Sequence, residues 1–167
     1  MANTLLQFDA ANFDGDNVPV TAGDKAAYFD VLQGRTVLVY PDGSDEYAAV
    51  TRAVEMPQQY AAGTLTAKIG YFTGATANGI QLEVYVEAVT DGDATDLDAG
   101  TSFDAANTAN PTVPATAGYI DVASITLTNK DSVAAGDMVR FLLRRDVDHA
   151  NDTAAASVYV LWLAIQE

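Results

Sequence analysis

The final run of the chain, Ser157–Ile165, constrains the fold more than any other segment because it is apolar on both faces. Successive side chains of a β-strand point to opposite faces, so a strand with one face in water alternates between apolar and polar residues. The run Ser-Val-Tyr-Val-Leu-Trp-Leu-Ala-Ile does not alternate. We therefore expect both of its faces to meet protein, in a sandwich core, at a subunit interface, or both.

A polar turn, residues 144–153, joins this run to the apolar run Met138–Leu143. Hydrolytic metal sites often combine histidine with carboxylates, but Asp and Asn side chains also bond nearby backbone amides and hold tight turns. We interpret the turn as a hydrogen-bonded connection between two core strands, in which Arg144 or Arg145 pairs with a carboxylate. The turn residues in question are Asp146, Asp148, His149, Asn151 and Asp152.

Short β runs separated by turn signals fill most of the remaining sequence, and no amphipathic helix is evident. Thr64–Phe72 and Ile80–Val89 alternate well, and in the second run we expect Gln81, Glu83 and Glu87 to face outward. The other expected strands are Tyr28–Leu32, Thr36–Tyr40, Tyr47–Glu55 and Tyr119–Leu127. This pattern predicts an all-β fold, an antiparallel jelly-roll-like β-sandwich.

Residues 1–25 read as an extended N-terminal arm, because their hydrophobic residues follow no helical or strand period and turn formers separate them. Residues 26–167 are expected to form a single β-sandwich domain. Residues 91–118 read as one long loop, and loops of such length in compact domains are often functional or interfacial.

The composition excludes several functions. The formal net charge of −15 repels nucleic acid and anionic lipid, so we expect no nucleic-acid or membrane partner. The chain has no cysteine, which removes disulfides and thiolate chemistry. It has one histidine and no Gly-x-Ser-x-Gly or phosphate-binding loop, so we expect no enzyme activity and no cofactor.

Two further groups of residues admit a binding role. Asp91, Asp93, Asp96 and Asp98 form a weak candidate for a cation site, but the helix–loop–helix calcium pattern fails because Asp96 and Ser102 occupy its glycine and glutamate positions. We expect a solvated acidic loop and no metal. A set of aromatic residues could instead stack on sugars, although aromatic residues in strands are more often core or interface residues. That set is Tyr60, Tyr71, Phe72, Tyr85, Tyr119 and Trp162.

The order of strands and turns over residues 55–167 resembles small virion proteins of tailed phages, a group with a jelly-roll-like β-sandwich found in capsid decoration proteins and in fibre or knob domains. The segments that carry the resemblance are Met56-Pro-Gln-Gln-Tyr60, Gly63–Tyr71, Gly79–Ala88, Ile125–Thr128, Ala135–Asp146, Asn151-Asp-Thr153 and the closing apolar strand. Members of the group often have Trp where this chain has Tyr71, a departure that preserves an aromatic residue.

The resemblance implies a capsid decoration, or cement, protein on the outer surface of an icosahedral phage head. Its partners would be the major capsid protein and itself, as a homotrimer. Capsid anchoring is expected from the arm, through Leu5, Leu6, Phe8, Phe13 and Val18. The subunit interface is expected at Tyr159, Leu161, Trp162 and Leu163. The alternatives are a receptor-binding knob or fibre module that recognises a host-surface glycan, and a cellular carbohydrate-binding module.

Overall fold

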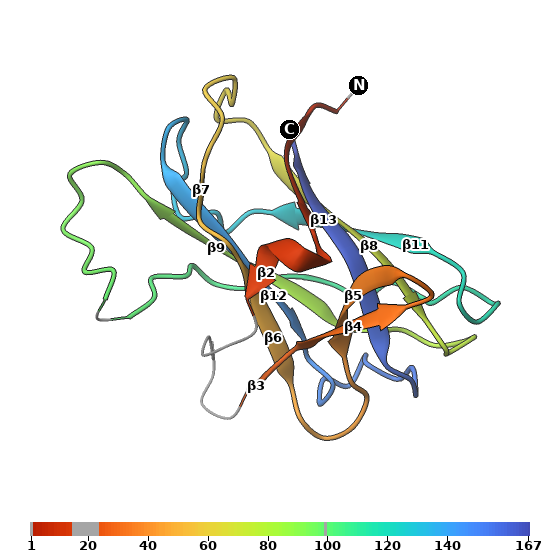
Figure 1. Cartoon of the computed structure of the whole chain (residues 1–167). Coiled ribbons are helices and arrows are strands. Elements are labelled where there is room, and N and C mark those ends of the chain that lie inside the picture. Colours follow the sequence, from red (N-terminus) through yellow and green to blue (C-terminus); the bar gives the residue numbers. More distant parts are fainter. Residues whose placement is uncertain (1, 15–23, 99) are drawn as a thin grey trace.

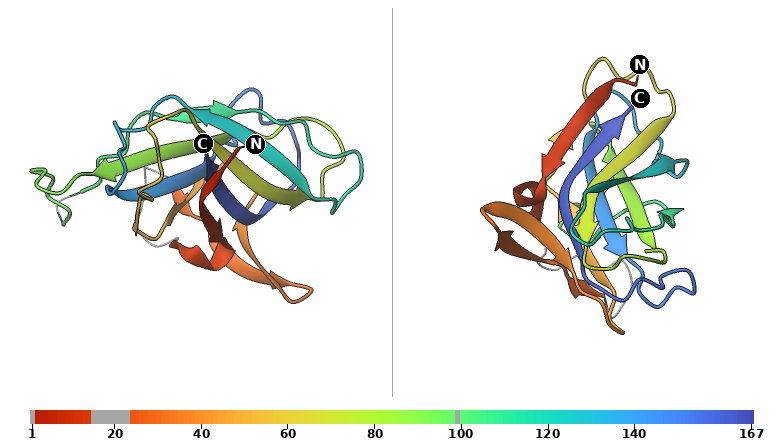
Figure 2. Two further views of the ribbon diagram at one scale, coloured as in Figure 1. Left: turned by 90° about the horizontal axis from the view of Figure 1, so that it is seen from above. Right: turned by 90° about the vertical axis from the view of Figure 1, so that its right-hand side faces the viewer.

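The computed structural model describes residues 2–14, 24–98 and 100–167, which form a sandwich of two β-sheets (Figures 1 and 2). One 3-10 turn, η1 (Ala10–Asn12), is the only helical element in this part of the chain. The strand pairs are antiparallel except that of β3 with β6. The all-β, antiparallel, jelly-roll-like sandwich expected from the sequence is confirmed.

Sheet A has the strand order β11-β8-β13-β5-β4, and β1 also pairs with β13. Its strands are β1 (Thr4–Asp9), β4 (Tyr28–Leu32), β5 (Arg35–Tyr40), β8 (Leu65–Thr73), β11 (Asp121–Leu127) and β13 (Val158–Gln166). Sheet B has the order β10-β9-β12-β6-β2, with β3 paired to β6 and β7 paired to β12. Its strands are β2 (Phe13–Asp14), β3 (Lys25–Ala26), β6 (Tyr47–Thr51), β7 (Val54–Glu55), β9 (Leu82–Val89), β10 (Asn107–Ala109) and β12 (Met138–Arg145).

The closing strand β13 fills the core with one face and leaves the other on the outside of sheet A. Val158, Val160, Leu163 and Ile165 are buried in the core shared by the two sheets. The register with β8 shifts between Val160 and Trp162, so Leu161 is an extra residue of the strand. The bulge shifts the phase of the strand, and the run does not alternate because its outward residues Tyr159, Leu161 and Trp162 are apolar too. It also corrects one expectation, because Leu163 belongs to the chain's own core and not to an outward face.

The N-terminal stretch differs from the expected arm. Strand β1 pairs with β13 over Thr4–Asp9, and Leu5, Phe8 and Phe13 are buried in the core. The register shift between Thr4 and Leu6 breaks the period-two pattern, which is why the sequence shows no strand there. Leu6 packs against the core, and Val18 lies outside the described residues. Anchoring by these side chains stays a prediction, and for Leu5, Phe8 and Phe13 it would require β1 and β2 to leave the sandwich.

The expectation that one face of β9 lies in water is wrong. Gln81, Glu83 and Glu87 are buried. Arg144 donates to Glu83 at 2.6 Å, Arg140 pairs with Glu87, and the Glu87 carboxylate accepts from the backbone N–H of Ser102 at 2.8 Å. The segment after the acidic loop therefore covers this part of sheet B, and arginines on β12 neutralise the carboxylates beneath it.

Two expected segments are interrupted. The run Tyr47–Glu55 is two strands, β6 and β7, because the chain leaves the ladder at Arg52, whose N–H bonds the carbonyl of Asn12 at 2.9 Å. The expected loop 91–118 contains strand β10, which pairs with β9. The Asn107 side chain holds it there by donating to the carbonyls of Val84 and Asn129 at 3.1 and 2.7 Å.

Candidate functional site

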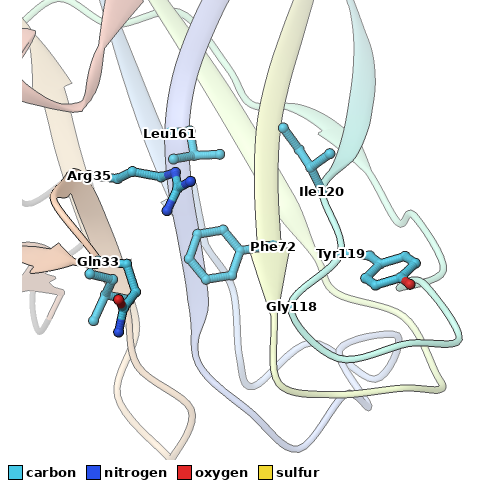
Figure 3. Close-up of a pocket in the computed structure, with 8 residues that line it drawn as sticks. Gln33, Arg35, Phe72, Gly118, Tyr119, Ile120 and Leu161 are labelled. Atoms are coloured by element: carbon cyan, nitrogen blue, oxygen red, sulfur yellow. The ribbon is translucent and has the colours of Figure 1, made fainter.

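A groove of about 640 Å3 lies on the outer face of sheet A (Figure 3). Its floor is formed by Phe72 of β8 and Leu161 of β13. The β4–β5 hairpin forms one wall, and the segment that leads into β11 forms the other. The wall residues are Leu32, Gln33 and Arg35 on one side and Gly118, Tyr119 and Ile120 on the other.

Strand register explains how these side chains share one face. Tyr159 of β13 lies opposite Phe72 on one side and opposite Val39 on the other, and Val39 lies opposite Tyr28 of β4. Opposed residues in a sheet point to the same face, so these four residues form a row across four strands. The rings of Phe72 and Tyr159 stack at a centroid distance of 5.0 Å and an interplanar angle of 16°.

Trp162 extends the apolar surface along β13. It lies opposite Gly70, which in turn lies opposite Val122 of β11. A Cβ atom at Gly70 would come within 2.2 Å of the indole atom Cε2, so the indole lies directly over the glycine. The absence of a side chain at position 70 therefore leaves the space that Trp162 occupies.

The far half of the same face is polar and small. The next row contains Gln7 of β1, Ala164, Lys68 and Ser124, and Lys68 donates to the Ser124 hydroxyl at 2.6 Å. The outer face of sheet A thus changes from polar to apolar along its strands. The apolar half also carries four of the exposed large hydrophobic residues, namely Tyr28, Tyr119, Ile120 and Val122.

A tight turn and short-range hydrogen bonds to the backbone fix the conformation of the two groove walls. Gln33 and Gly34 have φ values of 51° and 77°, the left-handed pair that a two-residue hairpin turn requires. The carboxylates of Asp30 and Asp121 accept from the N–H groups of the following residues at 2.7 and 2.8 Å. These bonds occupy an N–H group on each outermost strand of sheet A, which discourages strand addition there.

The electrostatics of the groove depend on Arg35. Among the residues that the structure describes, its guanidinium forms no ion pair, although the chain carries a formal charge of −15. The lining side chains include no carboxylate and no histidine. On the core side of β8, burial and the neighbouring Asp121 raise the pKa of Tyr71, whose hydroxyl donates to Asp121 at 3.1 Å. The apolar lining and the guanidinium of Arg35 suit the groove to apolar and anionic groups.

The structure brings together only some of the residues predicted from the sequence. Tyr159, Leu161 and Trp162, expected at a subunit interface, lie half-buried on the outer face of sheet A. Of the six aromatic residues considered for stacking, Phe72, Tyr119 and Trp162 lie on this face, and Tyr60 and Tyr71 are in the core. Tyr85 lies on β9 of sheet B, where its hydroxyl donates to Glu83 at 2.7 Å. Sequence reasoning missed Arg35, Gln33 and Ile120, and the only signal was the two-residue turn that separates two short apolar strands.

The acidic positions serve as loop and turn residues. Asp93 accepts from the N–H of Thr90 at 2.9 Å, and Asp96 accepts from that of Asp98 at 3.4 Å. In the described part of the chain, no group of three or more His, Asp or Glu side chains is placed to hold a metal ion. None of the helices described there could cross a membrane.

The turn after β12 contains the arginine–carboxylate pairing that the sequence predicted. The fully buried Arg145 donates to both carboxylate oxygens of Asp152, at 3.0 and 2.8 Å. It also donates to the carbonyls of Ala154 and Ala156 at 3.0 and 2.9 Å. The hydrogen-bonded connection is confirmed. His149 is exposed, and its Nδ1 accepts from the N–H of Asn151 at 3.1 Å.

No protein-family model matches the chain, and no curated protein sequence matches it. Solved structures with a similar fold include the C-terminal CBM6 of a laminarinase from Zobellia galactanivorans, 13% identical, covering 99% of this chain and 100% of that chain with a TM-score of 0.46. The CBM22-1 xylan-binding domain from Paenibacillus barcinonensis is 13% identical, with coverages of 99% and 94% and a TM-score of 0.47.

An exo-β-1,3-galactanase from Phanerochaete chrysosporium is 10% identical to the chain with a TM-score of 0.50. The match covers 96% of this chain and 29% of the galactanase chain. At such low identity the likeness concerns the fold alone. The chain is therefore similar to jelly-roll-like β-sandwich domains of known structure.

Proposed function

We propose that the protein is a non-enzymatic virion structural protein that decorates the outer surface of an icosahedral phage capsid and cements neighbouring capsid subunits. The observation that carries the proposal is the apolar half of the outer face of sheet A. Tyr119 and Ile120 are 65% and 59% exposed there, beside the Phe72–Tyr159 stack. Contiguous apolar surface of this kind on a soluble chain marks an interaction site.

The composition of this face favours a protein partner. Aromatic residues and arginine are enriched at protein–protein interfaces, and Tyr28, Tyr119, Tyr159, Trp162 and Arg35 supply them here. Aliphatic side chains, Leu161, Ile120 and Val122 among them, complete the patch. These side chains suit close packing against protein, whereas a reaction would need acid–base or nucleophilic groups that the groove lining does not offer.

The virion assignment rests on the resemblance of residues 55–167 to tailed-phage virion proteins. In this proposal the chain associates with itself as a homotrimer and with the major capsid protein on the outer capsid surface. A protein that binds only the assembled shell stabilises it by mass action. The high negative charge keeps the free protein soluble despite its apolar face.

A glycan-binding knob is a second candidate, because Phe72, Tyr159 and Tyr119 present aromatic rings at or beside an open groove. Aromatic faces stack on apolar faces of sugars as they do on other apolar groups. Two of the similar structures are carbohydrate-binding modules by name, but their likeness is one of fold.

Cryo-electron microscopy of purified virions tests the two candidates. The decoration proposal expects density for the sandwich at regular positions on the head and none at fibre tips. Removal of the protein should lower the temperature at which heads release DNA. Density at fibre tips, together with glycan-array binding abolished by Phe72→Ala, would instead establish the glycan-binding candidate.

A further inference from the structure

Leu97 is an exposed hydrophobic residue far from the groove. Seven large hydrophobic side chains are exposed in the described part of the chain. Four lie on the outer face of sheet A, and Phe29 and Val31 lie on the opposite face of β4. Leu97 is the seventh, 57% exposed in the loop between β9 and β10 and flanked by the exposed carboxylates of Asp96 and Asp98.

The loop and the groove lie on opposite sides of the molecule. In Figure 1 the loop that follows β9 extends to the left, whereas β8, β13 and β11, whose outer face bears the groove, lie on the right. Figure 2 shows the same loop projecting from one end of the sandwich. A chain in this conformation cannot place Leu97 in its own groove, but it can present the residue to another molecule.

The two features are complementary in hydrophobicity and charge. The groove offers an apolar floor, Phe72 and Leu161, and at its wall the guanidinium of Arg35, which has no ion-pair partner among the described residues. The loop offers one aliphatic side chain between two carboxylates. Burying Leu97 removes an exposed hydrophobic residue, and a carboxylate beside it gives Arg35 a partner.

We propose that the groove on sheet A receives Leu97 of a second copy of this chain, with Arg35 paired to the carboxylate of Asp96 or Asp98 of that copy. The proposal rests on the self-association included in the proposed function, and it assigns the surface that carries it. The contact joins two different surfaces, so it is heterologous and generates a ring where the rotation closes. Three copies would then form the trimer.

A second copy fits this groove better than a sugar chain does. Most of the lining is aliphatic or aromatic, and a protein loop with an aliphatic tip makes use of Leu32, Leu161 and Ile120. A sugar would leave these aliphatic side chains without matching apolar partners. Occupation of the groove by a second copy also accounts for Leu97, the one exposed large hydrophobic residue of the described segments that lies away from sheet A.

Sedimentation velocity of the purified full chain over a range of concentrations is the first test. The wild type should self-associate. Leu97→Asp and Ile120→Asp should each raise the dissociation constant roughly 10- to 100-fold, the effect of losing one buried aliphatic side chain. Ala94→Asp in the same loop and Ser124→Asp on the polar half of the same face are matched controls, and both should associate like the wild type. Circular dichroism establishes that each variant is folded.

Mixing the two defective variants is the sharper test. Leu97→Asp retains an intact groove and Ile120→Asp retains an intact loop, so an equimolar mixture should form a one-to-one complex that neither variant forms alone. If the groove instead packed on a second groove, Leu97→Asp alone would associate like the wild type, and mixing it with Ile120→Asp would recover nothing. A charge reversal provides a third test: Arg35→Glu should weaken association about fivefold, and combining it with Asp96→Lys and Asp98→Lys should restore it.

The outcomes separate this inference from the proposed function. A wild type that stays monomeric at all concentrations, or a mixture that fails to associate, overturns the inference, while head density in virions would still support the decoration role. Self-association rescued by mixing supports the inference even if virions lack the protein. If the wild type stays monomeric and binds a glycan in a manner abolished by Phe72→Ala, sugar is the groove's occupant and the inference is wrong.

Discussion

Replacing Asp152 with alanine tests the structural role of the polar turn between β12 and β13. Arg145 is fully buried, and the Asp152 carboxylate beside it is 2% exposed. This carboxylate accepts two hydrogen bonds from the guanidinium and a third from the backbone N–H of Gln81 at 2.9 Å. Asp152→Ala leaves the buried guanidinium with only the more distant carboxylate of Asp42, at 3.4 Å and 40% exposed, and with the carbonyl contacts to Ala154 and Ala156.

The expected cost follows from the burial. Removing the buried partner of an ion pair destabilises a protein by about 3–5 kcal/mol, because the remaining charge stays inside, here with only the longer and solvent-screened contact to Asp42. Domains of this kind unfold with a free energy of about 5–15 kcal/mol, so the loss is a large fraction of the total. At about 2–4 °C per kcal/mol, Tm should fall by roughly 6–20 °C. Urea titration followed by Trp162 fluorescence measures the same loss as a shift of the midpoint.

Two further variants show whether the buried charge is the cause. Arg145→Met combined with Asp152→Ala removes both charges and should recover part of the lost stability, because no unpaired charge remains. Asp148→Asn changes an exposed carboxylate in the same turn and should alter the unfolding free energy by less than about 0.5 kcal/mol. If Asp152→Ala costs no more than this control, Arg145 does not depend on Asp152 and the explanation fails.

Three other predictions concern separate parts of the molecule. Phe8→Ala should cost about 3–5 kcal/mol, measured by urea unfolding, because Phe8 packs in the core with its ring centroid 5.9 Å from that of Phe141; unchanged stability would restore the arm interpretation. Gly70→Ala should displace the Trp162 indole and red-shift its fluorescence, whereas an unchanged spectrum would show that the ring does not lie over position 70. Burial raises the pKa of the Asp131 carboxyl, and the nearby carboxylates of Asp104, Glu87 and Asp93 raise it further. The folded protein therefore loses stability as the pH rises from the ordinary carboxyl pKa to this raised pKa, because Asp131 must ionise in an unfavourable environment. Asp131→Asn retains an acceptor for the N–H of Ala88 and suits φ 51°, so it should raise Tm at neutral pH but not in acid, and an equal effect at both pH values would contradict this.

The sequence predicts the strands well where one face is apolar and the other polar. The run Tyr28–Leu32 is strand β4 with the expected bounds, and Thr64–Phe72 differs from β8 by one residue at each end. Prediction fails where a bulge changes the phase, as in β1, and where a polar side chain is buried by a distant partner. Glu87 reads as solvent-facing from its position in the alternation, but Arg140, more than fifty residues later, lies beside it and neutralises it.

The groove could be predicted only in part. Tyr159, Leu161 and Trp162 could be assigned to an interface because their strand is apolar on both sides. Arg35 and Ile120 could not, because no sequence pattern states which strands flank β13 or in which register. The groove residues come from segments that begin near residue 32 and end at residue 161, and only the sheet order brings them together.

The buried ion pair and the groove are linked through the start of β13. Arg145 binds the carbonyls of Ala154 and Ala156, and the Thr73 hydroxyl donates to the carbonyl of Ser157 at 2.8 Å. These bonds fix the residue at which β13 enters sheet A. Val158 then lies opposite Thr73, which places Tyr159 opposite Phe72 and the bulged Leu161 in the groove floor. A slip of one residue at this point would turn the apolar outer side chains inward. The turn that first resembles a metal site therefore sets the geometry of the surface proposed for binding.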